Sequence, residues 1–234
     1  MEINILQLIE GAKRARGLAV VIDVFRAFST ACYVTDRGVA RIVPVGDIET
    51  AYRLKRDNPS YILMGERGGV IQPGFDFGNS PTHAERADFT GRTVVHTTSA
   101  GTQGIANASG ADEVITGSFV NAGAIVKYIR ERKPERVSLV CMGLGGKTPA
   151  DEDTLCAEYI KNALEGKPND FEAVVKYLRD ESRTGSFMDL EGAVSETSAP
   201  KSDFDKCLEL DRFSFVLKVE PFEEDLKQLK KITV

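Results

Sequence analysis

The chain has 234 residues, which suits one large α/β domain or two small ones with a substantial buried core. Its 30 Lys and Arg residues and 35 Asp and Glu residues give a formal net charge of -5, and no basic run suggests a nucleic-acid partner. No apolar stretch approaches the roughly 18 residues that span a bilayer, so we expect no membrane partner.

The N-terminal segment and the cysteines predict a cytoplasmic protein. Residues 1–17 place their apolar run before their basic cluster, the reverse of a secretory signal. The cysteines show neither CxxC spacing nor a zinc pattern, so we expect buried free thiols. They are Cys32, Cys141, Cys156 and Cys207.

Short apolar runs alternate with helical periodicity along the first 165 residues. The predicted strands are 18–24, 41–45, 61–64, 93–96, 113–116 and 136–142, with a late strand at 213–219. The predicted helices are 25–36, 47–56, 120–132 and 151–165. This alternation predicts an α/β fold: a three-layer α/β/α arrangement with a mostly parallel mixed sheet.

The segment 166–210 differs from the rest because it is polar and mostly helical. Helices are predicted at 169–181 and 201–209, as a helical C-terminal segment. It forms either a cap over the site or an outer layer of helices, and the sequence does not choose between them. We treat residues 1–234 as a single domain.

Four predicted strands end in loops rich in Gly, Ser, Thr or charged residues. The loops are 23–26, 65–69, 97–102 and 143–153. In open α/β sheets, ligands bind beyond the carboxyl ends of the strands. If these strands are parallel neighbours, the four loops converge on one crevice.

The first loop contains an acidic residue and a basic residue three positions apart. Asp23 closes an apolar strand, where a carboxylate needs a metal, an arginine or backbone donors. It is either a Mg²⁺ ligand or the cap of the following helix. Arg26 offers a planar fork that matches two phosphate oxygens, although a surface salt bridge is the alternative.

The second loop, Gly-Glu-Arg-Gly-Gly at 65–69, indicates a backbone that turns sharply or approaches a ligand closely. Glu66 and Arg67 could serve metal and phosphate respectively, and a charged turn is the alternative. Further on, Asn79 and Ser80 precede Pro81, which predicts a helix start and a phosphate contact there.

The third loop carries small hydroxyl side chains at the start of a predicted helix. Such a loop leaves backbone amides open to an anion, so we expect it to bind phosphate. The residues are Thr98, Ser99, Gly101 and Thr102, and ordinary helix capping is the alternative. His96 precedes them as either a general acid or a hydrogen-bonded structural residue.

The fourth loop ends in Asp151, Glu152 and Asp153. Acids in the first turn of a helix suit its dipole without any function. Three carboxylates after a glycine loop also make a hard oxygen site for Mg²⁺, for which we favour Glu152 and Asp153.

The same loop resembles part of a nucleotide-binding motif at 143–148. Cys141 stands where a Walker A loop needs Gly, and Pro149 follows where the helix should already run. Phe25 also replaces the second acid of an aspartyl-phosphate motif. Direct attack by metal-activated water is therefore simpler than a covalent route.

Five of these segments resemble the 2-phosphosulfolactate phosphatases in sequence and in order. They are VIDVFRAFST, GERGG, FGNSP, TTSAGT and EDTLCA, and they fall between about residue 18 and residue 160. The resemblance implies an α/β/α enzyme that uses Mg²⁺ to convert (R)-2-phospho-3-sulfolactate to sulfolactate and phosphate, on a route to coenzyme M. Phe25, Phe28, Ala100 and Glu158 depart from the residues usual in that family.

Carried onto this chain, the resemblance and the loop chemistry give three sets of residues. Asp23, Arg26, Glu66 and Arg67 are expected to be catalytic; Asn79, Ser80, Thr98, Ser99, Gly101 and Thr102 to bind phosphate; Asp23, Glu152 and Asp153 to hold the metal. The partner is a small anionic phosphate ester, and the chain is either a monomer or a homodimer. The alternatives are a phosphatase of another phosphorylated 2-hydroxy acid, and a non-catalytic anion- or nucleotide-binding protein.

Overall fold

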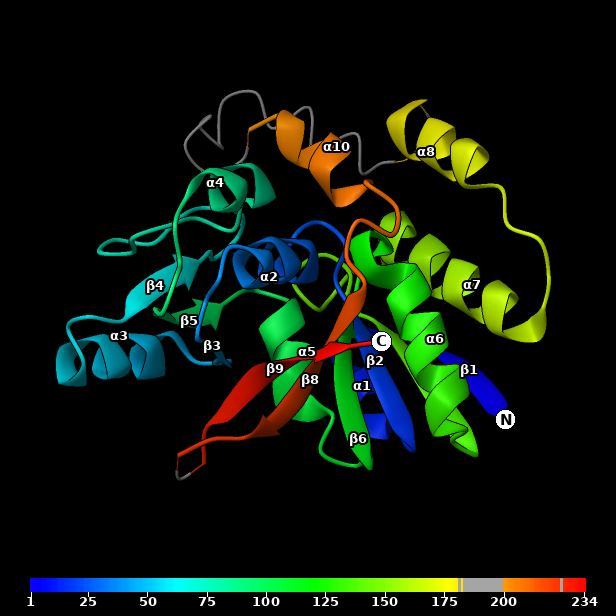
Figure 1. Ribbon diagram of the computed structural model, residues 1–234, viewed down its shortest axis with the longest axis horizontal. Coiled ribbons are helices and arrows are strands. Elements are labelled where there is room, and N and C mark those ends of the chain that lie inside the picture. The colour runs from blue at the N-terminus through cyan, green and yellow to red at the C-terminus, as the bar shows by residue number, and fades with distance from the viewer. Residues whose placement is uncertain (181, 183–199, 224) are drawn as a thin grey trace.

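The computed structural model describes residues 1–180, 182, 200–223 and 225–234. Its described strands form one sheet in the order β1-β7-β2-β6-β8-β9-β3-β5-β4 (Figure 1). Helices cover both faces of this sheet, so the predicted α/β fold is confirmed. The strands are β1 (Glu2–Gln7), β2 (Leu18–Ile22), β3 (Arg41–Pro44), β4 (Ile62–Gly65), β5 (Thr93–Thr97), β6 (Glu113–Gly117), β7 (Arg136–Cys141), β8 (Phe215–Pro221) and β9 (Lys227–Thr233).

The sheet consists of two parallel parts joined by an antiparallel hairpin. Strands β1, β7, β2 and β6 are parallel and form the first half-sheet. Strands β3, β5 and β4 are parallel and form the second half-sheet. The hairpin β8–β9 lies between the halves and pairs antiparallel with β6 on one side and β3 on the other.

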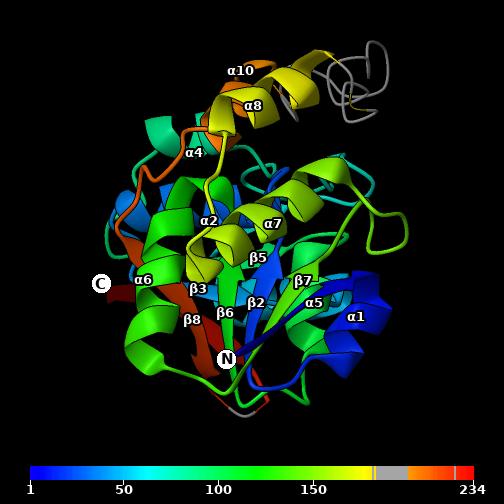
Figure 2. The ribbon, with the colours of Figure 1, turned by 90° about the vertical axis from the view of Figure 1, so that its right-hand side faces the viewer.

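Helices sandwich the first half-sheet (Figure 2). Helices α1 (Leu8–Arg14) and α5 (Gly101–Asn107) cover one face, and α6 (Ala122–Arg132) and α7 (Asp151–Glu165) cover the other. Strand β2 supplies both cores because its side chains alternate between the faces. Val21 packs in the cluster that contains α1 and α5 residues, and Val20 packs in the cluster that contains α6 and α7 residues.

The second half-sheet is covered in the same way. Helix α3 (Ile48–Asp57) packs over Val43, while α2 (Ala27–Asp36) shares a cluster with Ile42. Asp47 caps α3 by accepting a hydrogen bond from the Thr50 amide at 2.9 Å.

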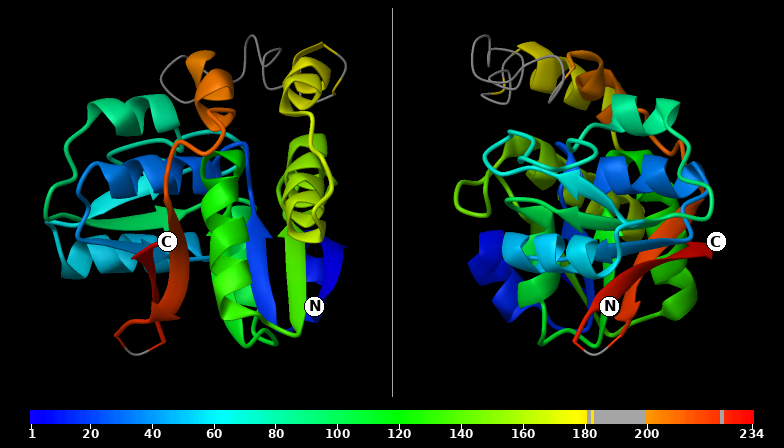
Figure 3. Two further views of the ribbon diagram at one scale, coloured as in Figure 1. Left: turned by 45° about the vertical axis from the view of Figure 1, so that its right-hand side comes forward. Right: turned by 90° about the vertical axis from the view of Figure 1, so that its left-hand side faces the viewer.

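Three helices lie beyond one end of the sheet, and the views agree on this placement (Figures 1 and 3). They are α4 (Pro81–Arg86), α8 (Phe171–Asp180) and α10 (Ser202–Cys207). Helix α10 contacts α4 and α2, and α8 contacts α7. The predicted helices at 169–181 and 201–209 therefore exist in shorter form, whereas 183–199 lies outside the described residues. A capping role for 166–210 stays a prediction.

Some elements were not predicted from the sequence. Strand β1, helix α1 and strand β9 are absent from the sequence-based assignment. The four cysteines are buried and free, as expected. No helix in the described part of the chain combines the length and apolar character needed to cross a bilayer.

Candidate functional site

The four strand-end loops belong to two pairs of neighbouring strands. Strands β2 and β7 are adjacent, and so are β4 and β5, but four strands separate the two pairs. Helix α5 bridges this separation, because it follows β5 directly and packs against β2 and α1. At its first residue, the Gly101 amide donates a hydrogen bond to the Asp23 carboxylate.

Asp23 is buried with only 6% of its surface exposed. Its Oδ1 accepts a hydrogen bond from the Ala27 amide at 3.0 Å, which caps the first turn of α2. Burial raises the pKa of Asp23 to about 6; the nearby charge of Glu66 adds to this rise, and the hydrogen bonds from the Ala27 and Gly101 amides oppose it. The side chain thus caps a helix and also sits in a region of excess negative charge.

Glu66 ties the second loop to the third. Its Oε1 accepts from the Ser99 amide at 2.7 Å, and its Oε2 accepts from the Gly69 amide at 2.7 Å and the Ser99 hydroxyl at 3.0 Å. The buried carboxylate is therefore held by donors from both sides. These hydrogen bonds hold Glu66 close enough to Asp23 for the Glu66 charge to raise the pKa of Asp23.

Two glycines permit these close approaches. Gly65 has a φ of 140°, and a Cβ there would lie 1.8 Å from the Thr97 carbonyl oxygen. A Cβ at Gly101 would lie 2.8 Å from Asp23 Oδ2. Neither position has room for a side chain, so each glycine is required by the way the loops pack.

Arg67 joins the ends of three strands. Its Nη1 donates to the Glu66 carbonyl at 2.7 Å, and its Nη2 donates to Thr97 Oγ1 at 2.7 Å and to the Gly46 carbonyl at 3.1 Å. These contacts orient the guanidinium at the edge of the site. Gly46 also lines a cavity of about 660 Å³ that extends past Thr102.

The hydroxyls of the third loop cap α5. The Thr98 amide donates to Thr102 Oγ1 at 3.0 Å, and the Thr102 amide donates to Thr98 Oγ1 at 3.2 Å. Ser99 reaches outward, where its Oγ also accepts from the Gly68 amide at 2.9 Å. The capping alternative thus describes Thr98 and Thr102, and Ser99 positions Glu66.

His96 and Asn79 form a buried pair. His96 Nε2 lies 3.1 Å from Asn79 Oδ1. Burial lowers the pKa of His96 to about 4, so the ring is neutral near pH 7. This arrangement matches the structural alternative for His96, and it orients the Asn79 amide.

Asp153 connects the loops after β2 and β7. Its Oδ1 accepts from the Val24 amide and its Oδ2 from the Gly143 amide, each at 2.8 Å. Burial raises the pKa of Asp153 well above its usual range, and the charges of Glu152 and Asp23 add to this effect. The two acids favoured from the sequence, Glu152 and Asp153, are both buried, and Asp153 lies close enough to Asp23 to be affected by its charge.

Asp151 faces the other way. Its Oδ2 accepts from the Tyr177 hydroxyl at 3.2 Å and from the Ser182 hydroxyl at 2.8 Å. It therefore attaches the α8 region to the start of α7 instead of pointing toward Asp23.

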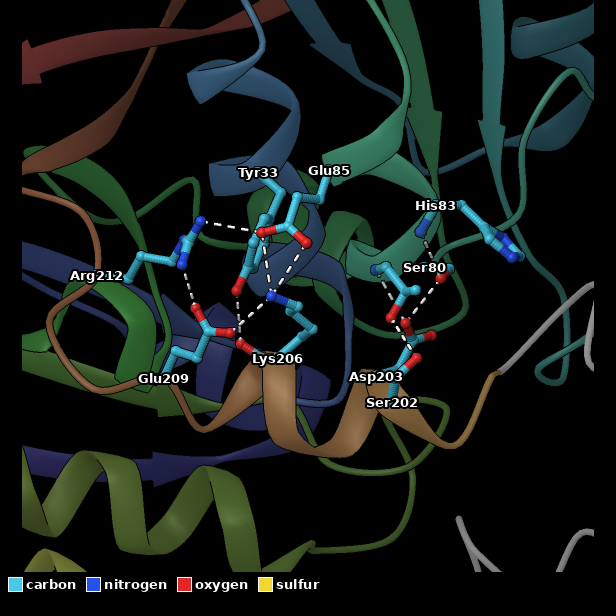
Figure 4. A network of polar contacts seen from close by, with 10 residues as sticks. Tyr33, Ser80, His83, Glu85, Ser202, Asp203, Lys206, Glu209 and Arg212 are labelled. Atoms are coloured by element: carbon cyan, nitrogen blue, oxygen red, sulfur yellow. Dashed lines mark hydrogen bonds and ion pairs between the residues drawn. The ribbon is translucent and has the colours of Figure 1, made fainter.

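Arg26 is buried and forms an ion pair that the sequence did not reveal. Its Nη1 lies 2.8 Å from Oδ2 of Asp203, on α10. Asp203 Oδ1 also accepts from the Ser80 hydroxyl at 2.7 Å and the Thr82 amide at 3.0 Å. Ser80 additionally caps α4, accepting from the His83 amide (Figure 4). Asp203 lies in the polar segment to which no chemistry was assigned, and no motif marks it.

The donor set suits a hard cation. No group of three or more His, Cys, Asp or Glu side chains is spaced to hold a metal within the described ranges. Mg²⁺ does not require such a cage, because it keeps several waters and takes one or two carboxylates plus substrate oxygens. Asp23 with Glu152 or Asp153 offers that number of carboxylates, and the repulsion that the Asp23 and Glu152 charges exert on Asp153 is of the kind a cation would relieve.

The 143–148 loop closes on itself. The Leu144 amide donates to the Thr148 carbonyl at 2.8 Å, and the Lys147 and Thr148 amides both donate to the Leu144 carbonyl. Amides used in this way do not form a phosphate cradle, which weakens the nucleotide-binding alternative.

Comparison with known proteins gives one consistent family. The family model described as 2-phosphosulpholactate phosphatase matches residues 3–221. A probable 2-phosphosulfolactate phosphatase of Caldicellulosiruptor saccharolyticus is 42% identical over 145 residues, which is 60% of each chain. One of Symbiobacterium thermophilum is 38% identical over 64% of each chain. The match thus spans about three fifths of these relatives.

A more distant relative matches over more of its length. The probable 2-phosphosulfolactate phosphatase of Thermoplasma volcanium is 29% identical over 208 residues, covering 88% of this chain and 92% of the relative.

Proposed function

The chain belongs to the 2-phosphosulpholactate phosphatase family, and from this premise we propose that it is a Mg²⁺-dependent phosphatase. Its substrate would be (R)-2-phospho-3-sulfolactate, and its products sulfolactate and phosphate. We further propose a cytoplasmic enzyme that acts on this small anionic ester and not on nucleic acid or membranes. The observation that carries the proposal is the meeting of Asp23, Glu66 and Asp153 at the strand ends of a chain matched almost throughout by this family.

The buried acids are the proposed metal ligands. Asp23 with Glu152 or Asp153 would hold Mg²⁺, which when bound supplies positive charge to the phosphoryl oxygens and orients water. Asp23, with a pKa of about 6, is ionised near pH 7 and so suited to that role.

The cationic side chains complete the proposed site. Arg26 and Arg67 have fixed charges and defined orientations, held by Asp203 and by strand-end oxygens respectively. Together with backbone amides of the 98–101 loop, they would stabilise charge that develops on the phosphoryl oxygens. In an alternative arrangement, one of the two binds the carboxylate or the sulfonate, the other anionic groups of the substrate.

The test is phosphate release with matched substrates. The purified protein is incubated with (R)-2-phospho-3-sulfolactate, with 2-phospholactate and with 2-phosphoglycerate, each with Mg²⁺ or with EDTA. We expect release that requires Mg²⁺ and is fastest with the sulfonate. Equal rates with 2-phospholactate would move the assignment to another phosphorylated 2-hydroxy acid. Ligand-dependent thermal stabilisation without released phosphate would identify a binding protein and overturn the proposal.

A further inference from the structure

Helix α10 is attached to α4 by two separate sets of contacts (Figure 4). The outer set is a network of charged side chains at the surface. Lys206 and Arg212 both donate to Glu85 at 3.0 Å, and both also donate to Glu209. The Tyr33 hydroxyl adds a bond to the Lys206 carbonyl at 3.1 Å. These contacts secure the helix without touching Arg26.

The inner set is centred on Asp203, whose side chain is 0% exposed. A buried carboxylate must be compensated, and Asp203 has a cation and two hydrogen-bond donors. Its Oδ1 is fixed by the Ser80 hydroxyl and the Thr82 amide. Its Oδ2 is thereby directed at Nη1 of Arg26.

The neighbouring residue supports the same contact. Phe204 packs against Phe25 with ring centroids 5.4 Å apart. Residues 25 and 26 of the first loop are thus both held by consecutive residues of α10. Helix α10 therefore contributes directly to the placement of the loop that starts with Asp23.

We propose that Asp203 is a positioning residue, which orients the Arg26 guanidinium for contact with an anionic substrate. This inference rests on the proposed function, since the phosphate contact of Arg26 belongs to it. Asp203 itself touches no reacting atom. Its effect on turnover is transmitted through Arg26, and it should vanish when Arg26 is removed.

A double-mutant cycle tests this dependence. Asp203→Asn keeps the size of the side chain and an acceptor for Ser80 and Thr82, but it removes the charge that holds Arg26. We expect kcat/KM to fall about 30-fold in the native background and less than about 3-fold in the Arg26→Ala background. An equal loss in both backgrounds would refute the inference.

Glu85→Gln is the matched control on the same helix pair. It weakens the outer network, because Lys206 and Arg212 lose one of their two shared carboxylates and keep Glu209, and it leaves Asp203 and Arg26 in place. We expect a lower Tm with kcat/KM within about 2-fold of the native value. A loss of turnover as large as that of Asp203→Asn would show that loosening of α10, and not the orientation of Arg26, controls the rate.

A second variant covers the case in which Asp203→Asn does not fold. Asp203→Glu keeps the charge but displaces it by one methylene. We expect it to lower kcat/KM about 10-fold with Arg26 present and less than about 2-fold without it.

The two proposals fail in different ways. If the unmodified protein releases no phosphate from any ester, the proposed function is wrong, and the cycle is then measured on the affinity for inorganic phosphate by calorimetry. Asp203→Asn should weaken that affinity only when Arg26 is present. An effect that persists in Arg26→Ala, or no phosphate binding by any of the four proteins, would refute the positioning role.

Discussion

The two half-sheets deliver different chemistry to the same place. The first brings three buried acids, Asp23, Glu152 and Asp153; burial raises the pKa values of Asp23 and Asp153, and the charges of Glu152 and Asp23 raise that of Asp153 further. The second brings one buried acid, Glu66, surrounded by amide and hydroxyl donors. The first half-sheet thus contributes three carboxylates to the site, whereas the second contributes one, which donors of its own loops hold. We infer that the cation binds on the first side and that the second supplies rigid donors.

The largest effect is expected from removing the charge of Asp23. In Asp23→Asn, Mg²⁺-dependent phosphate release should fall at least about 10³-fold, because one metal ligand is lost. The fold should remain intact, as judged by circular dichroism, since the amide can still accept from Ala27. A near-normal rate would show that Asp23 has no part in the mechanism. It would also contradict the inference that the cation binds at the first half-sheet.

The pH dependence of stability should set the two sides against each other in metal-free protein. His96, in the second half-sheet, has a folded pKa of about 4, below the unfolded value of 6.5. It contributes stability above pH 6.5 that is lost as the pH falls toward 4, about 3 kcal/mol. Asp23 has a folded pKa of about 6, above its unfolded value of 3.8. Its contribution is present below pH 3.8 and is lost as the pH rises through 6, again about 3 kcal/mol.

The two contributions therefore oppose each other between pH 4 and pH 6. Removing one reveals the other: in His96→Gln, the free energy of unfolding should decrease as the pH rises from 4 to 6. Urea titrations at several pH values measure this slope. A His96→Gln protein that becomes more stable over this range would show that Asp23 is not the opposing group.

A smaller effect is expected at Glu66. In the native protein, the Gly69 amide and the Ser99 hydroxyl both donate to Glu66 Oε2. Glu66→Gln places an NH₂ group, itself a donor, against them. We expect a loss of about 2 kcal/mol in the free energy of unfolding. Glu49→Gln, on the exposed first turn of α3, is the control and should change stability by less than about 0.5 kcal/mol. Equal losses of stability in the two variants would mean that the loop donors do not stabilise the Glu66 carboxylate.

The smallest effect is expected at Asp151, which belongs to the same run of acids as Glu152 and Asp153 but faces α8. Asp151→Ala removes the acceptor of Tyr177 and Ser182 and should cost about 1 kcal/mol of stability. Phosphate release should stay within about 2-fold. A loss comparable to that of Asp23→Asn would assign Asp151 to the metal site instead.

The sequence was most informative about buried parallel strands and the loops that follow them. The apolar run 18–24 identified β2, and the glycine- and hydroxyl-rich loop after 93–96 identified the start of α5. These features are local, since a strand buried on both faces must be apolar throughout. Strand β9 was missed because its Lys227–Thr233 sequence is largely polar.

Long-range pairing could not be predicted in the same way. The loops were expected to converge through adjacent strands, which holds within the pairs β2–β7 and β4–β5, but α5 brings the two pairs together across the four strands between them. The Arg26–Asp203 pair joins residues 177 positions apart, and an isolated aspartate in a polar segment has no distinguishing local pattern. Contacts of this kind depend on how helices pack, which periodicity does not encode.

The position of the β8–β9 hairpin has a consequence for synthesis on the ribosome. Every residue of the candidate site precedes Phe215, yet the strands that connect the two half-sheets begin only there. A nascent chain can therefore contain all of the proposed chemistry while its sheet is still divided, with β6 and β3 lacking their antiparallel neighbours. Until β8 and β9 are available to pair, these two strand edges are open to wrong partners.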